Sequence, residues 1–167
     1  AMATETEVLN IVQKDTLEIR VMEAQNLKNR YYHDSDFDIV VDGDEKMIYR
    51  EDMEFFIKQS PNNEARIEIE KKSQGSNYKD AFKRAENIDY EFSVENNIVY
   101  LNNYLTTDYD NKFRDQEIEI IIYVPENTFV KLHNSTRYHM EGNIKNNLNY
   151  YSNDLANHTW KMDNHGV

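Results

Sequence analysis

The 167-residue chain has no cysteine and little glycine or proline, with four and two of them respectively. Without cysteine there can be no disulfide framework, no thiolate nucleophile and no zinc site with cysteine ligands. Four glycines cannot supply either of the usual phosphate-binding loops, and neither a G-x-S-x-G nor an H-E-x-x-H motif occurs. We therefore expect a protein that is not an enzyme and that carries no cofactor.

The chain also lacks a long hydrophobic run and an excess of positive charge. No window approaches the roughly 18 consecutive apolar residues of a membrane span, and the opening "AMATETEV" has neither the basic nor the apolar region of a signal peptide. The net charge of -12 repels phosphate backbones, so nucleic acid is excluded as a partner. With 39% hydrophobic residues, a chain of this length can still bury a core of its own.

Period-two alternation dominates what is present. Leu17, Ile19 and Val21 share one face of "TLEIRV", and the same pattern recurs in "ARIEIEK" and "EIEIIIY". Six further runs are rich in aromatic and β-branched residues: "DFDIVV", "KMIY", "MEFFIK", "YEFSV", "IVYL" and "TFVKL". Asn96-Asn97 predicts a tight hairpin, because asparagine tolerates the positive φ of a primed turn. The sequence predicts a mainly β fold of layered antiparallel sheets, arranged as a β-sandwich or solenoid.

One segment has the pattern of an α-helix, near residues 76–88. In "SNYKDAFKRAENI", Tyr78, Phe82 and Ala85 fall on one face, and Ser76 or Asn77 can cap the start. We expect this helix to cross between two groups of strands.

The two ends of the chain differ in sequence character from its middle. We expect residues 1–4 to be a cloning remnant or disordered, and residues 5–132 to form a single β-rich domain. Residues 133–167 are rich in Asn and His and have little apolar periodicity. We expect them to form a polar tail or a peripheral element.

Two sets of side chains in the sequence could bind a ligand. His133, His139, His158 and His165 all lie in the C-terminal segment and are candidate metal ligands, but their spacing matches no known metal motif and favours exposed histidines instead. The second set is aromatic and could form a sugar-binding platform, although large rings more often fill a core. Its members are Tyr90, Phe92, Tyr100, Tyr104, Tyr109, Phe113 and Tyr123.

A longer pattern resembles a known family. The segment "RAENIDYEFSVENNIVYLNNYLTTDYDNKFRDQEIEIIIYVPENTFVKL" and the W-x-M-x-x-x-G near the end are similar to the soluble C-terminal region of bacterial PspC-domain (phage-shock-protein-C-like) envelope proteins. The resemblance runs from about Ala65 to Val130 and more faintly to Gly166, while residues 1–64 show no signature. It implies a toast-rack arrangement of layered sheets and no catalytic residues.

The resemblance also implies a role. It predicts an extramembrane sensor or scaffold domain for envelope stress, held at the membrane by segments that precede this chain. Its partners would be proteins, either envelope-stress components or a second copy of itself, with the strand edges and a Tyr/Asn surface as the contact face. A surface adhesin or glycan-binding β domain that uses exposed tyrosines is the alternative.

Overall fold

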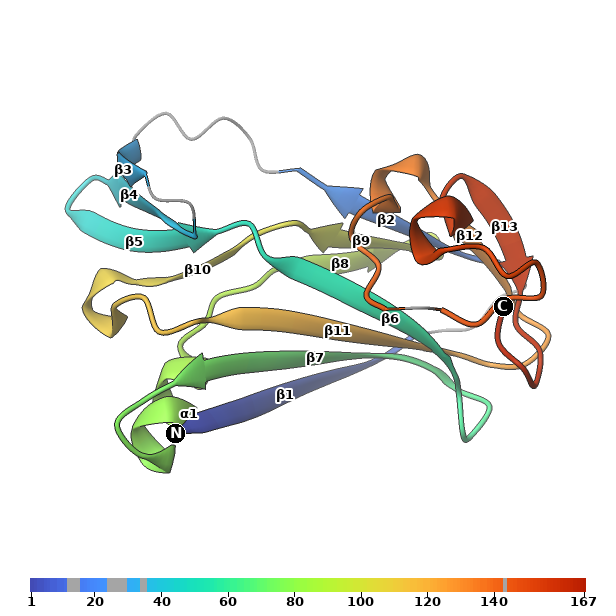
Figure 1. Cartoon of the computed structure of the whole chain (residues 1–167), viewed down its shortest axis with the longest axis horizontal. Coiled ribbons are helices and arrows are strands. Elements are labelled where there is room, and N and C mark those ends of the chain that lie inside the picture. The colour runs from blue at the N-terminus through green and yellow to red at the C-terminus, as the bar shows by residue number, and fades with distance from the viewer. Residues whose placement is uncertain (12–15, 24–29, 34–35, 143) are drawn as a thin grey trace.

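The computed structural model describes residues 1–11, 16–23, 30–33, 36–142 and 144–167. Its strands form three sheets, two of them long layers and the third at one end of the molecule (Figure 1). Sheet A has the order β1 (Met2–Ile11), β7 (Ala65–Gln74), β11 (Glu117–Val124) and β6 (Met53–Gln59). Sheet B has the order β13 (His158–Lys161), β12 (Phe129–Leu132), β2 (Thr16–Met22), β9 (Ile98–Asn102) and β8 (Phe92–Glu95). Sheet C has the order β10 (Leu105–Asp108), β5 (Glu45–Arg50), β4 (Asp38–Asp42) and β3 (Arg30–His33).

The pairing of these strands is mixed. β11 runs antiparallel to β7 but parallel to β6, and β2 lies between two parallel neighbours, β12 and β9. The mainly β, layered fold predicted from the sequence is confirmed, and all nine predicted runs are strands. Sheets A and B mix parallel and antiparallel pairs, whereas sheet C is purely antiparallel. Parallel neighbours need long connections, and β2, β9 and β12 do come from distant parts of the chain.

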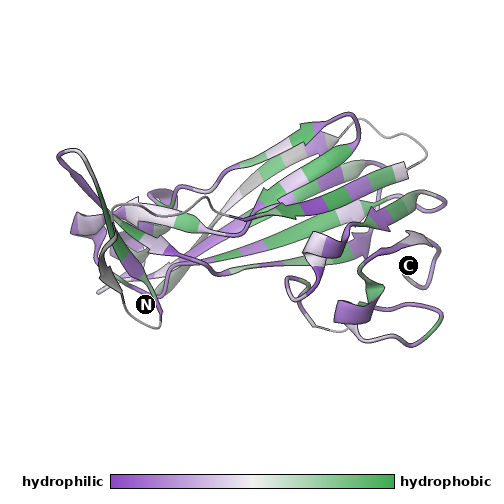
Figure 2. Cartoon of the chain, turned by 90° about the horizontal axis from the view of Figure 1, so that it is seen from above, coloured by the Kyte–Doolittle hydropathy of each residue, from purple (hydrophilic) through white to green (hydrophobic). Residues whose placement is uncertain are grey.

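The main core lies between sheets A and B. Alternate residues of each long strand point inward, so hydrophilic and hydrophobic residues alternate along the ribbons (Figure 2). Ile67 and Ile69 of β7, Ile120 and Ile122 of β11, and Ile19 of β2 are fully buried in one cluster. The hairpin predicted at Asn96-Asn97 is present, with φ of 51° and 61° at these residues, and it joins β8 to β9.

Both ends of the chain differ from the expectation drawn from the sequence. Residues 2–4, expected to be a remnant or disordered, begin β1, where Met2 pairs with Gln74 and Ala3 is buried. The reason is that β7 is long enough to give every residue of β1 a backbone partner.

The C-terminal segment is likewise part of the core rather than a polar tail. It contains the 3-10 helices η2 (Asn134–Thr136) and η3 (Ser152–Leu155) and ends with β13 on the edge of sheet B. Leu155, Trp160 and Met162 are buried in the main cluster, and the Trp160 indole donates a hydrogen bond of 3.0 Å to the carbonyl of Leu155. Asn147, Asn157 and Asn164 lie in turns of this segment, and its buried residues follow no simple period.

The α-helix predicted near residues 76–88 is α1 (Tyr78–Glu86), which follows β7 and packs against β7 and β1. Asn77 is the N-cap, and its side chain accepts a hydrogen bond of 2.9 Å from the Asp80 backbone. Ala81 and Ala85 face the sheet and are fully buried, whereas Tyr78, predicted on the same face, is 64% exposed. The small alanines let the helix lie so close that a Cβ on Gly75 would stand 2.4 Å from the Ala81 nitrogen.

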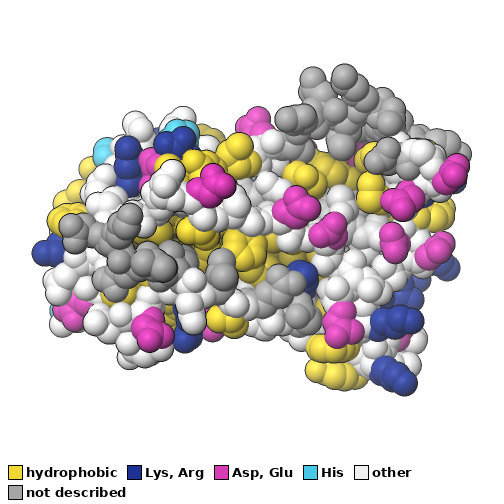
Figure 3. Space-filling model, turned by 180° about the vertical axis from the view of Figure 1, so that it is seen from behind, with side chains coloured by type: hydrophobic (Ala, Val, Ile, Leu, Met, Phe, Trp, Pro, Cys, Tyr) yellow, Lys and Arg dark blue, Asp and Glu magenta, His cyan; other side chains and the backbone are white. Residues whose placement is uncertain are grey.

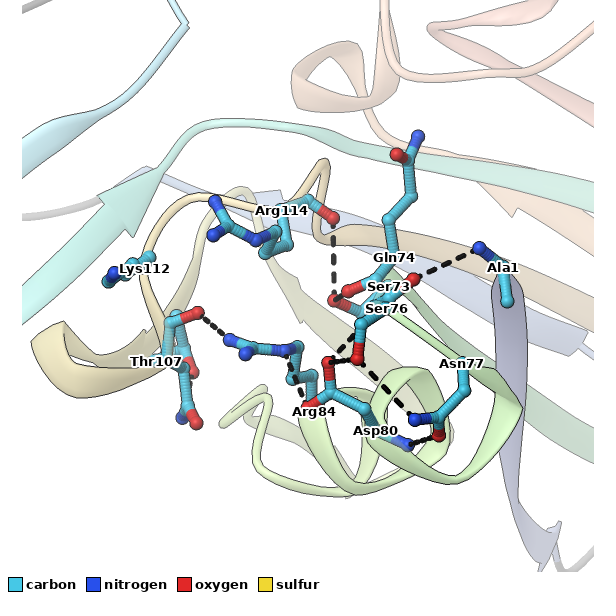
Figure 4. Close-up of polar contacts among 12 residues, drawn as sticks. Ala1, Ser73, Gln74, Ser76, Asn77, Asp80, Arg84, Thr107, Lys112 and Arg114 are labelled. Atoms are coloured by element: carbon cyan, nitrogen blue, oxygen red, sulfur yellow. Dashed lines mark hydrogen bonds and ion pairs between the residues drawn. The ribbon is translucent and has the colours of Figure 1, made fainter.

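Polar contacts fix the start of α1 (Figure 4). Asp80 accepts hydrogen bonds from the Ser76 backbone at 2.9 Å and from Arg84 Nε at 3.1 Å. These contacts, that of Ser76 first, hold the pKa of the Asp80 carboxyl below its ordinary value. The amino group of Ala1 donates to the Gly75 carbonyl at 3.0 Å, so the end of β1 is joined to the same corner.

Candidate functional site

The candidate ligand-binding site lies where the chain passes from sheet B into sheet C. Its floor is a two-stranded ribbon made of residues 89–95 and residues 98–106, joined by the Asn96-Asn97 turn. Within the ribbon the Asp89 N–H donates to the Thr106 carbonyl at 2.8 Å, and the Thr106 N–H donates back at 3.0 Å. Phe92 pairs with Leu101 farther along, so a single ribbon spans the two sheets.

Residues alternate between the two faces of the ribbon along "DYEFSVE". Asp89, Glu91, Ser93 and Glu95 are all exposed. The intervening Tyr90 is buried, and Phe92 and Val94 pack against the main core. Buried Tyr90 donates a hydrogen bond of 2.8 Å to the Asn102 carbonyl, and burial raises the pKa of its hydroxyl. The apolar side therefore anchors the ribbon, and the acidic side is left free to meet a partner.

The walls come from two other parts of the chain. The Asn103 N–H donates to the Met22 carbonyl at 3.0 Å, which places the end of β2 beside the ribbon. β4 and β5 of sheet C contribute Val40, Met47 and Tyr49 on the other side. Together they enclose a hollow of about 850 Å³, which we call the inter-sheet hollow. The residues lining it are Met22, Glu23, Val40, Met47, Tyr49, Asp89, Glu91, Phe92, Ser93, Glu95, Tyr100, Asn102, Tyr104 and Thr106.

The inter-sheet hollow is acidic and aromatic. Among its described lining residues, four are Asp or Glu and none is Lys, Arg or His. Within the described part of the chain, no ion pair involves Glu23, Asp89, Glu91 or Glu95. Seen from behind, the molecule carries hydrophobic side chains in hollowed areas with acidic side chains spread around them (Figure 3).

Tyr49 forms the most deeply buried part of the wall. It is 3% exposed, and its hydroxyl donates a hydrogen bond of 3.1 Å to the Glu51 carboxylate. Burial first, and then the negative charge of Glu51, raise the pKa of the Tyr49 hydroxyl far above its ordinary value. The phenol therefore stays neutral, and Tyr49 supports the wall as a fixed ring.

The aromatic side chains proposed as a sugar platform do not form one surface. Phe92, Tyr100 and Tyr104 line the inter-sheet hollow, whereas Tyr90 belongs to the core. The other three lie elsewhere and each has a cationic group over its ring. These pairs are Lys46 over Tyr109 at 5.4 Å, Arg50 over Phe113 at 5.3 Å and Arg66 over Tyr123 at 4.3 Å.

The candidate metal ligands are also dispersed. His133 caps η2, where its Nδ1 accepts from the Ser135 backbone at 3.1 Å, and His158 lies in β13 beside Tyr150 and Trp160. His139 pairs through its backbone with Phe55, and His165 lies near the end of the chain. The described residues include no group of three His, Cys, Asp or Glu side chains suited to a metal ion. The expectation that these histidines bind no metal stays a prediction.

A second ionisable cluster lies on the outer face of sheet A. Lys72 of β7 donates a hydrogen bond to Glu119 of β11, and this contact lowers the pKa of the Glu119 carboxyl. Glu141, from the segment beside β6, lies close enough to Glu119 for the two carboxyls to affect each other's pKa. Burial, followed by the charge of Glu119, raises the pKa of Glu141. Two carboxyls whose pKa values diverge in this way can share one proton between them.

Sequence analysis did not single out the acidic residues of the hollow or its two methionines. The exposed, alternating Asp89, Glu91 and Glu95 could have been read from "DYEFSVE", since each directly follows or precedes an aromatic or apolar residue. Met22 and Met47 carry no such signal, because only the tertiary arrangement brings them to the ribbon.

Comparison with known proteins gives one match. A family model described as "ToastRack found in some PspC" matches residues 40–167, well over half of the chain. No curated protein and no solved structure matches it. The matched residues include the whole lining of the inter-sheet hollow except Met22 and Glu23. Within the described ranges, no helix combines the length and apolar character that a membrane crossing requires.

Proposed function

Because this chain belongs to the toast-rack family found in some PspC proteins, we propose that it is a non-catalytic sensor or scaffold domain of the bacterial envelope that acts through protein contacts. The match confirms the resemblance seen in the sequence and extends it upstream, since it begins at residue 40 rather than near Ala65. The domain is an extramembrane part of a PspC-type protein. Its proposed partners are envelope-stress components or a second copy of itself.

The inter-sheet hollow is the observation that carries the contact role. Aromatic residues and methionine are enriched at protein interfaces relative to other surfaces. The hollow combines Met22, Met47 and Tyr100 with a rim of carboxylates that is able to orient a partner. Met22 is 46% exposed, so apolar area is available without unfolding any element.

The sensor or scaffold role is tested in cells that carry the full-length parent protein. The parent gene is altered so that Asp89→Asn, Glu91→Gln and Glu95→Gln change together, and an envelope-stress reporter is measured before and after membrane damage. We expect the response to be strongly reduced while the parent protein remains at its normal level. A parent protein with Glu64→Gln, Glu86→Gln and Glu126→Gln has the same charge change at exposed positions outside the hollow and should respond normally. An unchanged response after removal of the whole domain would refute the role.

Glycan binding is a second candidate, favoured by one observation. Phe92, Tyr100 and Tyr104 present three rings in the same hollow, together with the amide of Asn102 and carboxylates that can accept hydrogen bonds from sugar hydroxyls. A glycan array with the purified domain tests this role, with Tyr100→Ala and Tyr104→Ala as the informative variants. Tyr151→Ala is the control, because Tyr151 is 78% exposed and lies outside the hollow. Failure of every glycan to bind would rule the candidate out.

A further inference from the structure

We propose that the inter-sheet hollow binds an extended basic peptide segment in which lysine or arginine alternates with apolar residues. This inference rests on the proposed contact role and specifies the chemistry of the partner. Three properties of the hollow support it. Its carboxylates form no ion pair with any described residue, they are regularly spaced, and two of its aromatic rings have no described cation beside them.

The first property is charge. Some carboxylates elsewhere on the described surface have close cationic neighbours: Arg50 lies 2.7 Å from Asp52, and Arg66 lies 3.2 Å from Glu68. In the hollow four carboxylates gather with no cation in the lining and no ion pair to any described residue. A cationic partner would relieve their mutual repulsion, whereas an anionic one would add to it. The net charge of -12 would also steer a cation toward the protein.

The second property is spacing. Asp89, Glu91 and Glu95 occupy every second position of the ribbon, with Ser93 completing the row. Alternate residues on an extended chain lie about 6.5 to 7 Å apart. A second extended chain has the same repeat, so basic side chains at its alternate positions can meet successive carboxylates. A compact cation cannot span such a row.

The third property is that two aromatic rings of the hollow have no cation beside them among the described residues. Five rings at other places on the surface have a Lys or Arg within about 6 Å, among them Tyr123 and Tyr109. Tyr100 and Tyr104, both half-exposed in the hollow, have no such cation among the described residues. A bound lysine or arginine would complete the contact that the other rings already make. The apolar residues of the segment would contact Met22, Val40 and Met47.

The binding test uses the whole purified domain and a fluorescein-labelled synthetic peptide in which four lysines alternate with valines. Binding is followed by fluorescence anisotropy at low salt. We expect saturable binding that weakens steeply as salt is raised, because the charge contacts are screened. A peptide with the same composition but its four lysines in one block should bind several-fold more weakly. The same peptide with glutamate in place of lysine should not bind.

Matched variants locate the binding. The triple change Asp89→Asn, Glu91→Gln and Glu95→Gln should weaken binding about tenfold, as expected for the loss of three exposed charge contacts. The control triple Glu64→Gln, Glu86→Gln and Glu126→Gln should weaken it no more than about twofold, since it changes net charge equally without touching the hollow. Tyr100→Ala should also weaken binding, with Tyr151→Ala as its control. The acidic positions and Tyr151 are exposed, Tyr100 is half-buried, and all of them lie outside the core cluster, so the variants should fold, and thermal melts verify this.

Several results would overturn the proposal. These are absence of binding, equal binding of the alternating and block peptides, equal loss in the two triple variants, or competition by a glycan but not by unlabelled peptide. Such a result leaves the stress-reporter experiment untouched. A domain that fails with the peptide yet supports the reporter through these residues would have the contact role with a different partner. A domain that binds the peptide but does not affect the reporter would lack the envelope role.

Discussion

The rings of Tyr49 and Tyr104 are stacked, with their centroids 5.0 Å apart and their planes inclined by 24°. Tyr49 comes from β5 and is buried, while Tyr104 comes from the link between β9 and β10 and is half-exposed in the inter-sheet hollow. The pair therefore joins sheet C to the ribbon that forms the floor. The same ring contact therefore forms part of the wall of the hollow and joins the two sheets.

Removal of the Tyr104 ring should weaken that junction. We expect Tyr104→Ala to reduce the free energy of unfolding by about 1 to 2 kcal/mol, because the stacking and part of the buried ring area are lost. Tyr104→Phe keeps the ring and should change it by less than about 0.5 kcal/mol. Urea unfolding of the two variants measures the difference. Equal stabilities would show that the stack does not hold the sheets together.

The C-terminal segment should prove essential for stability. Leu155 is fully buried in the main core, so Leu155→Ala should lower the free energy of unfolding by about 2 to 5 kcal/mol. Leu148 belongs to the same segment but is 55% exposed, and Leu148→Ala should cost about 0.5 kcal/mol or less. Urea unfolding monitored through Trp160 fluorescence compares them. A small effect of Leu155→Ala would mean that the segment is peripheral after all.

The two ends of the chain contain strands that the sequence did not predict. The nine predicted strands contain alternating or β-branched runs, and their side chains alone set the inward face. Four strands were not predicted, namely β1, β3, β10 and β13. β13 is only "HTWK", with Trp160 as its single buried residue, and β1 begins in the stretch interpreted as a remnant. Long-range pairing, rather than local pattern, makes both of them strands.

The candidate site was likewise predictable from the sequence only in part. The acidic alternation of residues 89–95 is visible in the sequence, and the rings Tyr100 and Tyr104 belonged to the predicted aromatic set. No local pattern indicates that the end of β2 and two strands of sheet C close around them. That depends on the parallel pairing of β2 with β9, which joins segments far apart in the chain. The family resemblance identified the fold but carried no residues of a site.

The opposite pKa shifts of Glu119 and Glu141 predict a pH-dependent stability. The pKa of Glu141 is raised in the folded protein by burial and by the charge of Glu119, so the stability that its protonated form provides is lost as pH rises through the folded pKa. Glu141→Gln stays uncharged and can still donate to Glu119. We expect the variant to melt at a higher temperature than the parent domain at pH 8, with the difference shrinking toward pH 4.

Thermal melts across this range test the prediction, with Glu126→Gln as an exposed control on another part of the molecule. A constant difference at every pH would indicate a packing effect. A lower melting temperature of Glu141→Gln at pH 8 would contradict the assigned cause.

Asp80 should show the opposite dependence. The hydrogen bond from Ser76, and then that from Arg84, lower its pKa, so its contribution to stability is present above its unfolded pKa and is lost as pH falls through the folded pKa. Asp80→Asn should therefore melt at a lower temperature than the parent domain at pH 7. The two should converge well below pH 3.8, the ordinary value for this group. Glu86→Gln, at the last residue of the same helix, should show no such convergence.

The position of β2 between β9 and β12 has a consequence for how the protein is made. Residues 16–22 leave the ribosome long before their partners at residues 98–102 and 129–132 have been synthesised. Sheet B therefore cannot form strand by strand during translation, and β2 must wait, apolar side exposed, until most of the chain is available. Folds dominated by such distant pairings fold slowly. We expect this domain to be most vulnerable to aggregation and proteolysis during synthesis, before its last strands arrive.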